Sequence, residues 1–196
     1  MNDPNLAQAD LEKVAFLNGI PEKEFRVNGH KGRDIARLRP MFDSLLLAVS
    51  DGNYFEMGCG TGMLCRYICL FSGKNIMPHG IDKNPAAIKL AKKANFKFQE
   101  NFVHGNFFAL FPGQLAEMDT ILFFVFFGRG GKTYTEWLPV FLRSLSGCIK
   151  KECRIIIFSY NHDLLKDSLL EDLFGLLSDK YDCTARTKHF YVFMLK

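Results

Sequence analysis

The sequence lacks the features that mark secreted, membrane-spanning and zinc-binding chains. Its six cysteines include no C-x-x-C pair, and its first 20 residues contain no apolar segment typical of a secretory leader. The longest apolar run, residues 121–127, is far too short to cross a bilayer. We therefore expect a cytoplasmic protein with free thiols, no membrane partner and no metal site.

A strong charge of either sign is also missing, because the formal net charge is only +4. Basic side chains nevertheless gather early in the chain, at Arg26, Lys31, Arg33, Arg37 and Arg39. This stretch is either a solvated face or a site for an anion such as a carboxylate, a phosphate or a nucleic-acid backbone. No aromatic residues interleave with it as on a single-strand binding platform, which favours a small anion over nucleic acid.

The chain has 196 residues, of which 48% are hydrophobic, enough for a full core. We divide it into an N-terminal helical extension or lid, residues 1–49, and an α/β domain, residues 50–196. Strands and helices alternate along the second part, which predicts a doubly wound, mostly parallel sheet with helices on both faces. The expected strands are 53–57, 76–81, 96–103, 120–127 and 154–160, and two further strands form a C-terminal hairpin over 181–196. The expected helices are 5–18, 34–49 (kinked or divided at Pro40), 61–71, 84–94, 133–145 and 164–177.

The stretch YFEMGCGTGM at 54–63 places glycine at three alternate positions directly after a carboxylate. So much glycine indicates that something approaches this backbone closely. The dinucleotide fingerprint G-x-G-x-x-G would need glycine where Met63 stands, and no Gly-Lys-Ser/Thr follows as in a Walker A loop. Ligands of open parallel sheets bind beyond the carboxyl ends of the strands, where this loop is expected to lie.

Residues 50–196 resemble the class I S-adenosylmethionine-dependent methyltransferases. The resemblance rests on EMGCGTG at 56–62, GIDKNP at 80–85 and HGNFF at 104–108, together with the buried fourth strand and the terminal hairpin. It implies a Rossmann-like sheet of seven strands and S-adenosylmethionine as the cofactor.

The same resemblance implies the roles of the loop and of the next strand end. Glu56 is expected to bind the ammonium group of the cofactor, directly or through water. Gly58 and Gly60 would offer flat backbone beneath the ribose and the methionyl chain, and the same loop includes Cys59 and Gly62. Asp82 would accept hydrogen bonds from both ribose hydroxyls.

The adenine side of the expected site departs from the family pattern at two positions. Asn106 stands where many relatives carry an acid that contacts the adenine amino group, although an amide oxygen can accept the same bond. Lys83 stands where relatives often place an apolar side chain over the base. Phe107 could pack on the adenine face or belong to the core.

The methyl acceptor is not identified by the sequence. His162 could act as a general base after the fifth strand, with Tyr160 beside it, although a surface role fits His162 equally well.

The motif Asn/Asp-Pro-Pro-Tyr is absent after the fourth strand, which argues against amino-methyltransferases of DNA. Arg129 and Lys132 stand there instead of carboxylates, which argues against metal-dependent enzymes. A small-molecule O- or N-acceptor is favoured. A protein or RNA acceptor docked on 26–39 and a non-catalytic cofactor binder stay open.

Overall fold

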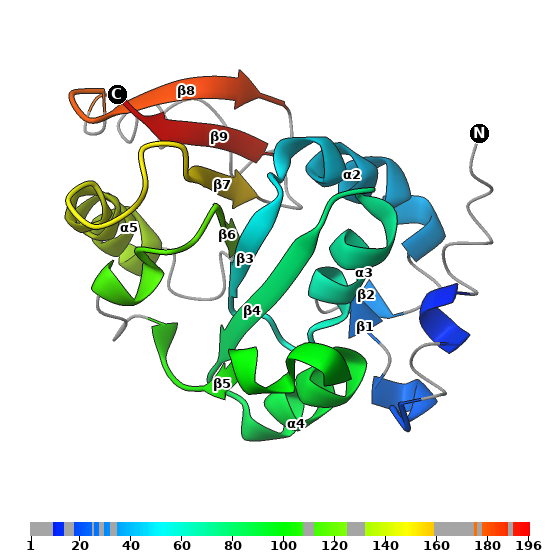
Figure 1. Ribbon diagram of the computed structural model, residues 1–196. Helices are drawn as coiled ribbons and strands as arrows, with labels where there is room; N and C mark the ends of the chain where they lie inside the picture. The colour runs from blue at the N-terminus through cyan, green and yellow to red at the C-terminus, as the bar shows by residue number, and fades with distance from the viewer. Residues whose placement is uncertain are drawn as a thin grey trace. The chain divides into compact units, whose positions relative to one another are not determined.

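A computed structural model describes residues 10–13, 18–24, 26–27, 30–31, 35–107, 112–124, 132–158, 175, 178–187 and 190–196 (Figure 1). Its main sheet has seven strands in the order β5-β4-β3-β6-β7-β9-β8. These strands are β3 (Gly52–Met57), β4 (Ile76–Asp82), β5 (Phe102–His104), β6 (Thr120–Phe124), β7 (Arg154–Phe158), β8 (Tyr181–Arg186) and β9 (Phe190–Leu195). The predicted fold class is confirmed: the sheet is mostly parallel and ends in a C-terminal antiparallel hairpin.

The remaining described elements are helices and one short hairpin. The helices are α2 (Ile35–Ala48), α3 (Met63–Phe71), α4 (Pro85–Ala94) and α5 (Lys132–Leu145), and the 3-10 helices are η1 (Glu22–Glu24), η3 (Phe96–Asn101) and η5 (Pro112–Leu115). A separate antiparallel pair joins β1 (Arg26–Val27) to β2 (His30–Lys31). Contacts divide the chain into two compact units, Met1–Ala109 and Leu110–Lys196.

In the first unit, β3, β4 and β5 run parallel, and α3 packs against β4 (Figure 1). Both α2 and α4 contact α3. Tyr67 of α3 is fully buried, and its hydroxyl donates to Asp43 of α2 at 2.6 Å. The parallel register pairs Met57 with Ile81, so β3 and β4 end side by side. The loops that follow these two strands therefore start from neighbouring points.

In the second unit, β6 and β7 pair in parallel, with Ile121 opposite Ile155. All five residues of β6 are buried, as its run of apolar residues predicts for a strand covered on both faces. β9 then pairs antiparallel with both β7 and β8, which confirms the predicted terminal hairpin.

The structure corrects one predicted strand and excludes one of the two alternatives given for a predicted helix. Residues 96–103 were expected to form a strand, but 96–101 form the 3-10 helix η3 and only Phe102–His104 form β5. Asn95 ends α4, and its carbonyl accepts the Phe98 N–H at 2.7 Å, so the chain turns tightly before it extends. The helix predicted to kink or divide at Pro40 is a single assigned helix, α2, with Pro40 inside it.

Parts of the expected organisation lie outside the described residues. Of the predicted helix 5–18, the structure describes Asp10–Lys13 as helical, and nearly all of the predicted helix 164–177 is not described. Among the described helices, none is both long and apolar enough to cross a membrane.

Candidate functional site

The glycine loop joins the end of β3 to the start of α3. Gly58, Gly60 and Gly62 have φ angles of +77°, +53° and +67°, in the left-handed region that favours glycine. The loop is tied to the neighbouring strand because the N–H groups of Gly58 and Cys59 donate to the Ile81 carbonyl at 2.8 and 3.0 Å.

The three glycines meet different surroundings. A Cβ atom on Gly62 would lie 2.8 Å from the Cβ atom of Ala91, so this glycine allows α4 to pack against the start of α3. A Cβ atom on Gly58 would lie 3.7 Å from Phe107. A Cβ atom on Gly60 would meet nothing within 4 Å. Gly60 therefore faces open space, whereas Gly62 is required by packing.

Asp82 ends β4 beside the loop, as predicted. Its Oδ2 atom accepts the Gly60 N–H at 2.9 Å, and its Oδ1 atom accepts the Asn84 N–H at 2.8 Å. A carboxylate oxygen can accept more than one hydrogen bond, so both oxygens keep capacity for a further donor. The carboxylate is half-buried and fixed by two backbone groups, which orients it for a ligand.

Asn84 begins α4 in the way that the Asn-Pro signal predicts. Its side-chain oxygen accepts the N–H groups of Ala86 at 3.0 Å and Ala87 at 3.4 Å, and Pro85 occupies the first turn. This cap, and not Asp82, satisfies the first donors of the helix. The Asp82 carboxylate is therefore not used as the cap of α4.

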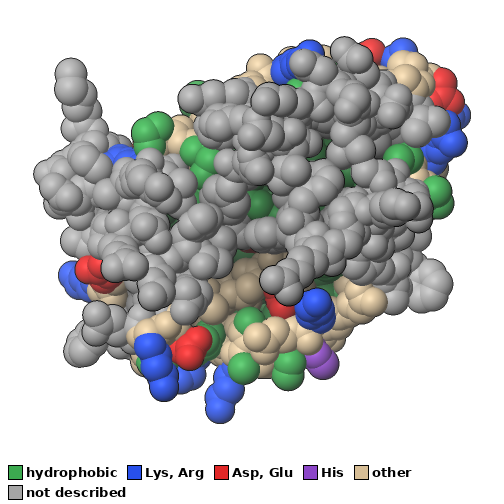
Figure 2. Space-filling model, turned by 180° about the vertical axis from the view of Figure 1, so that it is seen from behind, with side chains coloured by type: hydrophobic (Ala, Val, Ile, Leu, Met, Phe, Trp, Pro, Cys, Tyr) green, Lys and Arg blue, Asp and Glu red, His purple; other side chains and the backbone are tan. Residues whose placement is uncertain are grey.

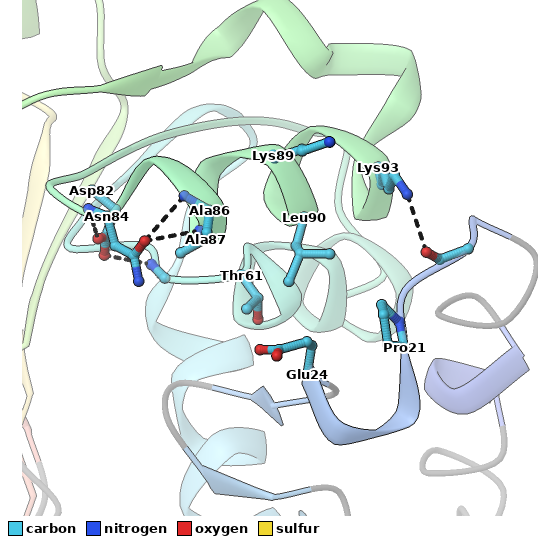
Figure 3. A pocket seen from close by; sticks show the side chains of 12 residues that line it. Pro21, Glu24, Thr61, Asp82, Asn84, Ala86, Ala87, Lys89, Leu90 and Lys93 are labelled. Atoms are coloured by element: carbon cyan, nitrogen blue, oxygen red, sulfur yellow. Dashed lines mark hydrogen bonds between the residues drawn. The ribbon is translucent and has the colours of Figure 1, made fainter.

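A cavity of about 550 Å³ opens next to Asp82 (Figure 3). This volume is in the range of small-molecule sites. Loop residues Gly60 and Thr61 line one end with Asp82 and Asn84, and one face of α4 lines its length. That face consists of Ala86, Ala87, Lys89, Leu90 and Lys93.

The N-terminal segment forms the opposite wall through Gly19, Pro21 and Glu24. Figure 3 shows the Glu24 carboxylate pointing into the cavity toward Thr61. The Lys93 ammonium donates to the Gly19 carbonyl at 3.2 Å and so holds this segment against α4. No local pattern in the sequence predicts these residues, because Gly19 and Lys93 are 74 positions apart. The spacing of Ala86, Leu90 and Lys93 on one helical face was the available signal.

Glu56 lies on the buried side of the loop. Its side chain is 0% exposed, and its Oε2 atom accepts a hydrogen bond from the Cys65 thiol of α3 at 2.9 Å. Burial raises the pKa of Glu56 to about 8, although hydrogen bonding from Cys65 acts to lower it. Within the described part of the chain, the Oε1 atom of Glu56 has no hydrogen-bond partner.

Cys59 packs inward and does not line the cavity of Figure 3. Its side chain is 3% exposed, and a Cβ atom added to Gly80 would lie 2.7 Å from the Cys59 sulfur. Gly80 thus makes room for Cys59 beneath the loop. Burial raises the pKa of this thiol, which therefore stays protonated.

The residues predicted for the adenine side lie at the ends of β4 and β5. Phe107 lies against the backbone of Gly58, in van der Waals range of an added Cβ atom. Lys83 and Asn106 are exposed. The Lys83 carbonyl lies 3.1 Å from the ring nitrogen Nε2 of His104. Of the nine residues predicted to bind the cofactor, Gly60 and Asp82 line the described cavity.

The predicted acceptor-side residues Tyr160 and His162 lie outside the described residues. All six cysteines are free thiols. Among the side chains that the structure describes, no group of three or more His, Cys, Asp or Glu is placed to hold a metal ion.

No family model matches this sequence. The chain is 32% identical over 80 residues to a probable cobalt-precorrin-6B C(15)-methyltransferase (decarboxylating) of Pyrobaculum aerophilum. The match covers 41% of this chain and 41% of that relative, so the chain spans well under half of the relative's length.

Solved structures share the fold over most of the chain at low sequence identity. TrmN from Thermus thermophilus has a TM-score of 0.57 at 14% identity, over 81% of this chain and 48% of that one. The mitomycin 7-O-methyltransferase MmcR has a TM-score of 0.58 at 11% identity, over 97% and 67% of the two chains. An RNA methyltransferase from Salinibacter ruber in complex with S-adenosyl-L-homocysteine has a TM-score of 0.51 at 15% identity, over 79% and 88%.

Proposed function

We propose that this chain, which has the fold of the class I methyltransferases, transfers a methyl group from S-adenosylmethionine to a small-molecule oxygen or nitrogen acceptor. One observation carries the donor part of the proposal. The carboxylate of Asp82 and the open backbone of Gly60 line the same cavity, at the ends of two neighbouring parallel strands. That is the edge of the sheet where a ligand of this fold is expected.

The donor's chemistry fits the residues present. It has two vicinal ribose hydroxyls, an ammonium group and a sulfonium, and it carries no phosphate. Asp82 offers acceptor oxygens for the hydroxyls, and Glu56 has a buried oxygen without a described partner. Gly58 and Gly60 let the ligand approach the main chain. Cys59 and Gly62 belong to the same loop and pack against Gly80 and Ala91. Lys83, Asn106 and Phe107 stay our candidates for the adenine side.

When bound, S-adenosylmethionine supplies an electrophilic methyl group whose transfer disperses charge. The chain's own residues then act mainly by alignment, since no new charge has to be stabilised. Asp82 fixes the ribose end because its own orientation is set by two backbone N–H groups. His162 is our candidate for the base that removes the acceptor's proton, with Tyr160 as its neighbour.

Of the five basic residues in the stretch 26–39, the structure describes only the side chain of Arg39. Arg39 is only 9% exposed, and its Nε atom donates to Asp43 at 3.1 Å. It is therefore committed to packing within α2. On the face drawn in Figure 2, the described Lys and Arg side chains are scattered among Asp and Glu side chains. The buried position of Arg39 removes one candidate docking residue, which supports our choice of a small-molecule acceptor.

The donor part is tested by calorimetry with S-adenosylmethionine and S-adenosylhomocysteine. We expect binding in the micromolar range, and absence of binding at millimolar ligand contradicts the proposal.

The acceptor part is tested by incubating the protein with donor labelled in the methyl group and a cell extract. We expect the label in the small-molecule fraction. Label in protein or RNA rejects the acceptor assignment but keeps the enzyme, and binding without any transfer supports a regulatory binder.

A further inference from the structure

The cavity beside Asp82 has a second acidic side chain, which the N-terminal segment supplies. Glu24 ends the 3-10 helix η1, is half-buried and lines the cavity. Figure 3 shows its carboxylate pointing toward Thr61, the loop residue that follows Gly60. Among the residues that the structure describes, none forms a hydrogen bond or an ion pair with this carboxylate. Its charge is therefore available to a ligand that crosses the glycine loop.

The segment that carries Glu24 is held in place on both sides of its turn. The Glu24 N–H group donates to the Pro21 carbonyl at 2.8 Å, which closes the turn of η1. Ile20, directly before this turn, is buried. The Lys93 ammonium of α4 donates to the Gly19 carbonyl at 3.2 Å. The segment is therefore a wall of the cavity that is tied to α4, and it presents Glu24 to the ligand site.

The charged side chains along the cavity are separated by sign. Asp82 and Glu24 lie at the end formed by the glycine loop, while both lysines, Lys89 and Lys93, belong to the face of α4. Lys93 uses its ammonium on the N-terminal segment, and Figure 3 shows the Lys89 side chain extending away from Asp82. Two carboxylates at one end of a cavity repel each other, and a cation offsets this repulsion. The loop end therefore favours a ligand group that is positively charged.

We infer that Glu24 selects the sulfonium of S-adenosylmethionine over the neutral thioether of S-adenosylhomocysteine, and that Lys93 is the positioning residue that holds Glu24 in place. This inference rests on the proposed function. The sulfonium is joined to the ribose through a single CH2 group, so a ribose held by Asp82 keeps the positive sulfur at the loop end. After transfer the sulfur is neutral, because the methyl group leaves without its bonding electron pair and the acceptor releases a proton. The product has lost the charge that Glu24 attracts, which favours its exchange for fresh donor.

The test is titration calorimetry with S-adenosylmethionine and S-adenosylhomocysteine, which differ by one methyl group and one positive charge. Glu24→Gln should lose about tenfold in affinity for the first ligand and less than about twofold for the second, because only the sulfonium attracts the carboxylate as a charge. Glu100→Gln is the matched control, since Glu100 is exposed on η3 and does not line the cavity. It should keep the wild-type affinities. A Glu24→Gln variant that keeps both affinities, or loses both equally, overturns the inference.

The role of Lys93 is tested against the neighbouring Lys92, which does not line the cavity. Lys93→Gln and Lys92→Gln each remove one positive charge from α4. Loss of charge alone would strengthen the binding of a cation, whereas loss of the bond to Gly19 would displace Glu24 and weaken it. We expect Lys93→Gln to lose about fivefold in affinity for S-adenosylmethionine and Lys92→Gln to stay within about twofold of the wild type. Lys93→Arg should restore the affinity, since a guanidinium can also donate to the Gly19 carbonyl. Unchanged or stronger binding by Lys93→Gln contradicts the positioning role.

The outcomes separate this inference from the proposed function. If neither ligand binds the wild-type chain at millimolar concentration, the proposed function fails. If both bind and Glu24→Gln does not change the ratio of their affinities, the inference is wrong and the donor site stands. Retained binding of S-adenosylhomocysteine by each variant shows that a lost affinity for S-adenosylmethionine does not reflect unfolding.

Discussion

Two carboxylic acids close neighbouring strands of the same sheet, and they have opposite surroundings. Asp82 at the end of β4 is half-buried, lines the cavity and accepts two backbone N–H groups. Glu56 near the end of β3 is fully buried and bonds to a thiol. The Asp82 carboxylate is oriented to accept hydrogen bonds from a ligand, whereas burial raises the pKa of Glu56 to about 8.

The difference teaches that the glycine loop has a ligand side and a packing side. Gly60 faces the cavity on the first side, and Gly62 contacts α4 on the second. A single short motif therefore sets both the shape of the ligand site and the position of the helix that lines it. Substitutions on the two sides should separate binding from stability.

The largest expected effect is on the pH dependence of stability. The folded-state pKa of Glu56 is raised from 4.5 to about 8, so its contribution to stability is fully present below 4.5 and is lost as the pH rises to about 8. At about 1.4 kcal/mol per pH unit, the full loss is on the order of 5 kcal/mol. In urea unfolding at about pH 5 and pH 8.5, Glu56→Gln should lack this loss. If the stability of the wild-type chain and of Glu56→Gln depends on pH in the same way, the pKa of Glu56 is not raised by burial.

The second effect concerns the ligand side. Asp82→Ala should weaken S-adenosylhomocysteine binding by about 1–3 kcal/mol, because the ribose loses its acceptor. Asp51→Ala is the matched control, since Asp51 also accepts a backbone N–H, from Asn75 at 2.8 Å, at the opposite end of β3 and β4. Calorimetry should show near-wild-type affinity for the control. Equal losses in both variants would mean that Asp82 acts only through general stability.

The smallest effect compares two glycines of the loop. Gly62→Ala should lower the free energy of unfolding by about 2 kcal/mol, because its Cβ atom clashes with Ala91 and its φ angle is left-handed. Gly60→Ala should cost about 1 kcal/mol from backbone strain alone, yet it should impair ligand binding more. Chemical unfolding and calorimetry on both variants measure the two quantities. If Gly60→Ala were less stable than Gly62→Ala, the assignment of Gly60 to the ligand side and Gly62 to the packing side would be wrong.

Much of the fold could be predicted because local signals agree with it. The Asn84-Pro85 pair places the start of α4, and the apolar run from Thr120 gives a strand buried on both faces. The loop and Asp82 also follow from local spacing. Segment 96–101 was mispredicted because its alternating aromatic residues suggest a strand, while the turn after Asn95 imposes a 3-10 helix.

The rest of the site depends on contacts that no local pattern contains. Cys65 meets Glu56 because α3 packs back against the sheet, where it contacts β4. Glu24 lines the cavity beside the segment that Lys93 holds at Gly19. Gly80 is needed because the Cys59 sulfur occupies the space of a side chain. These contacts join residues that are distant in the sequence and depend on tertiary packing. Local sequence patterns therefore do not predict them.

The most direct test of the account is a crystal structure of the chain with S-adenosylhomocysteine. We predict that both ribose hydroxyls lie within hydrogen-bond distance of the Asp82 carboxylate and that the nucleoside crosses the main chain at Gly60. A nucleoside bound elsewhere, or an Asp82 carboxylate without a ligand contact, would contradict the assignment of this cavity as the methyl-donor site.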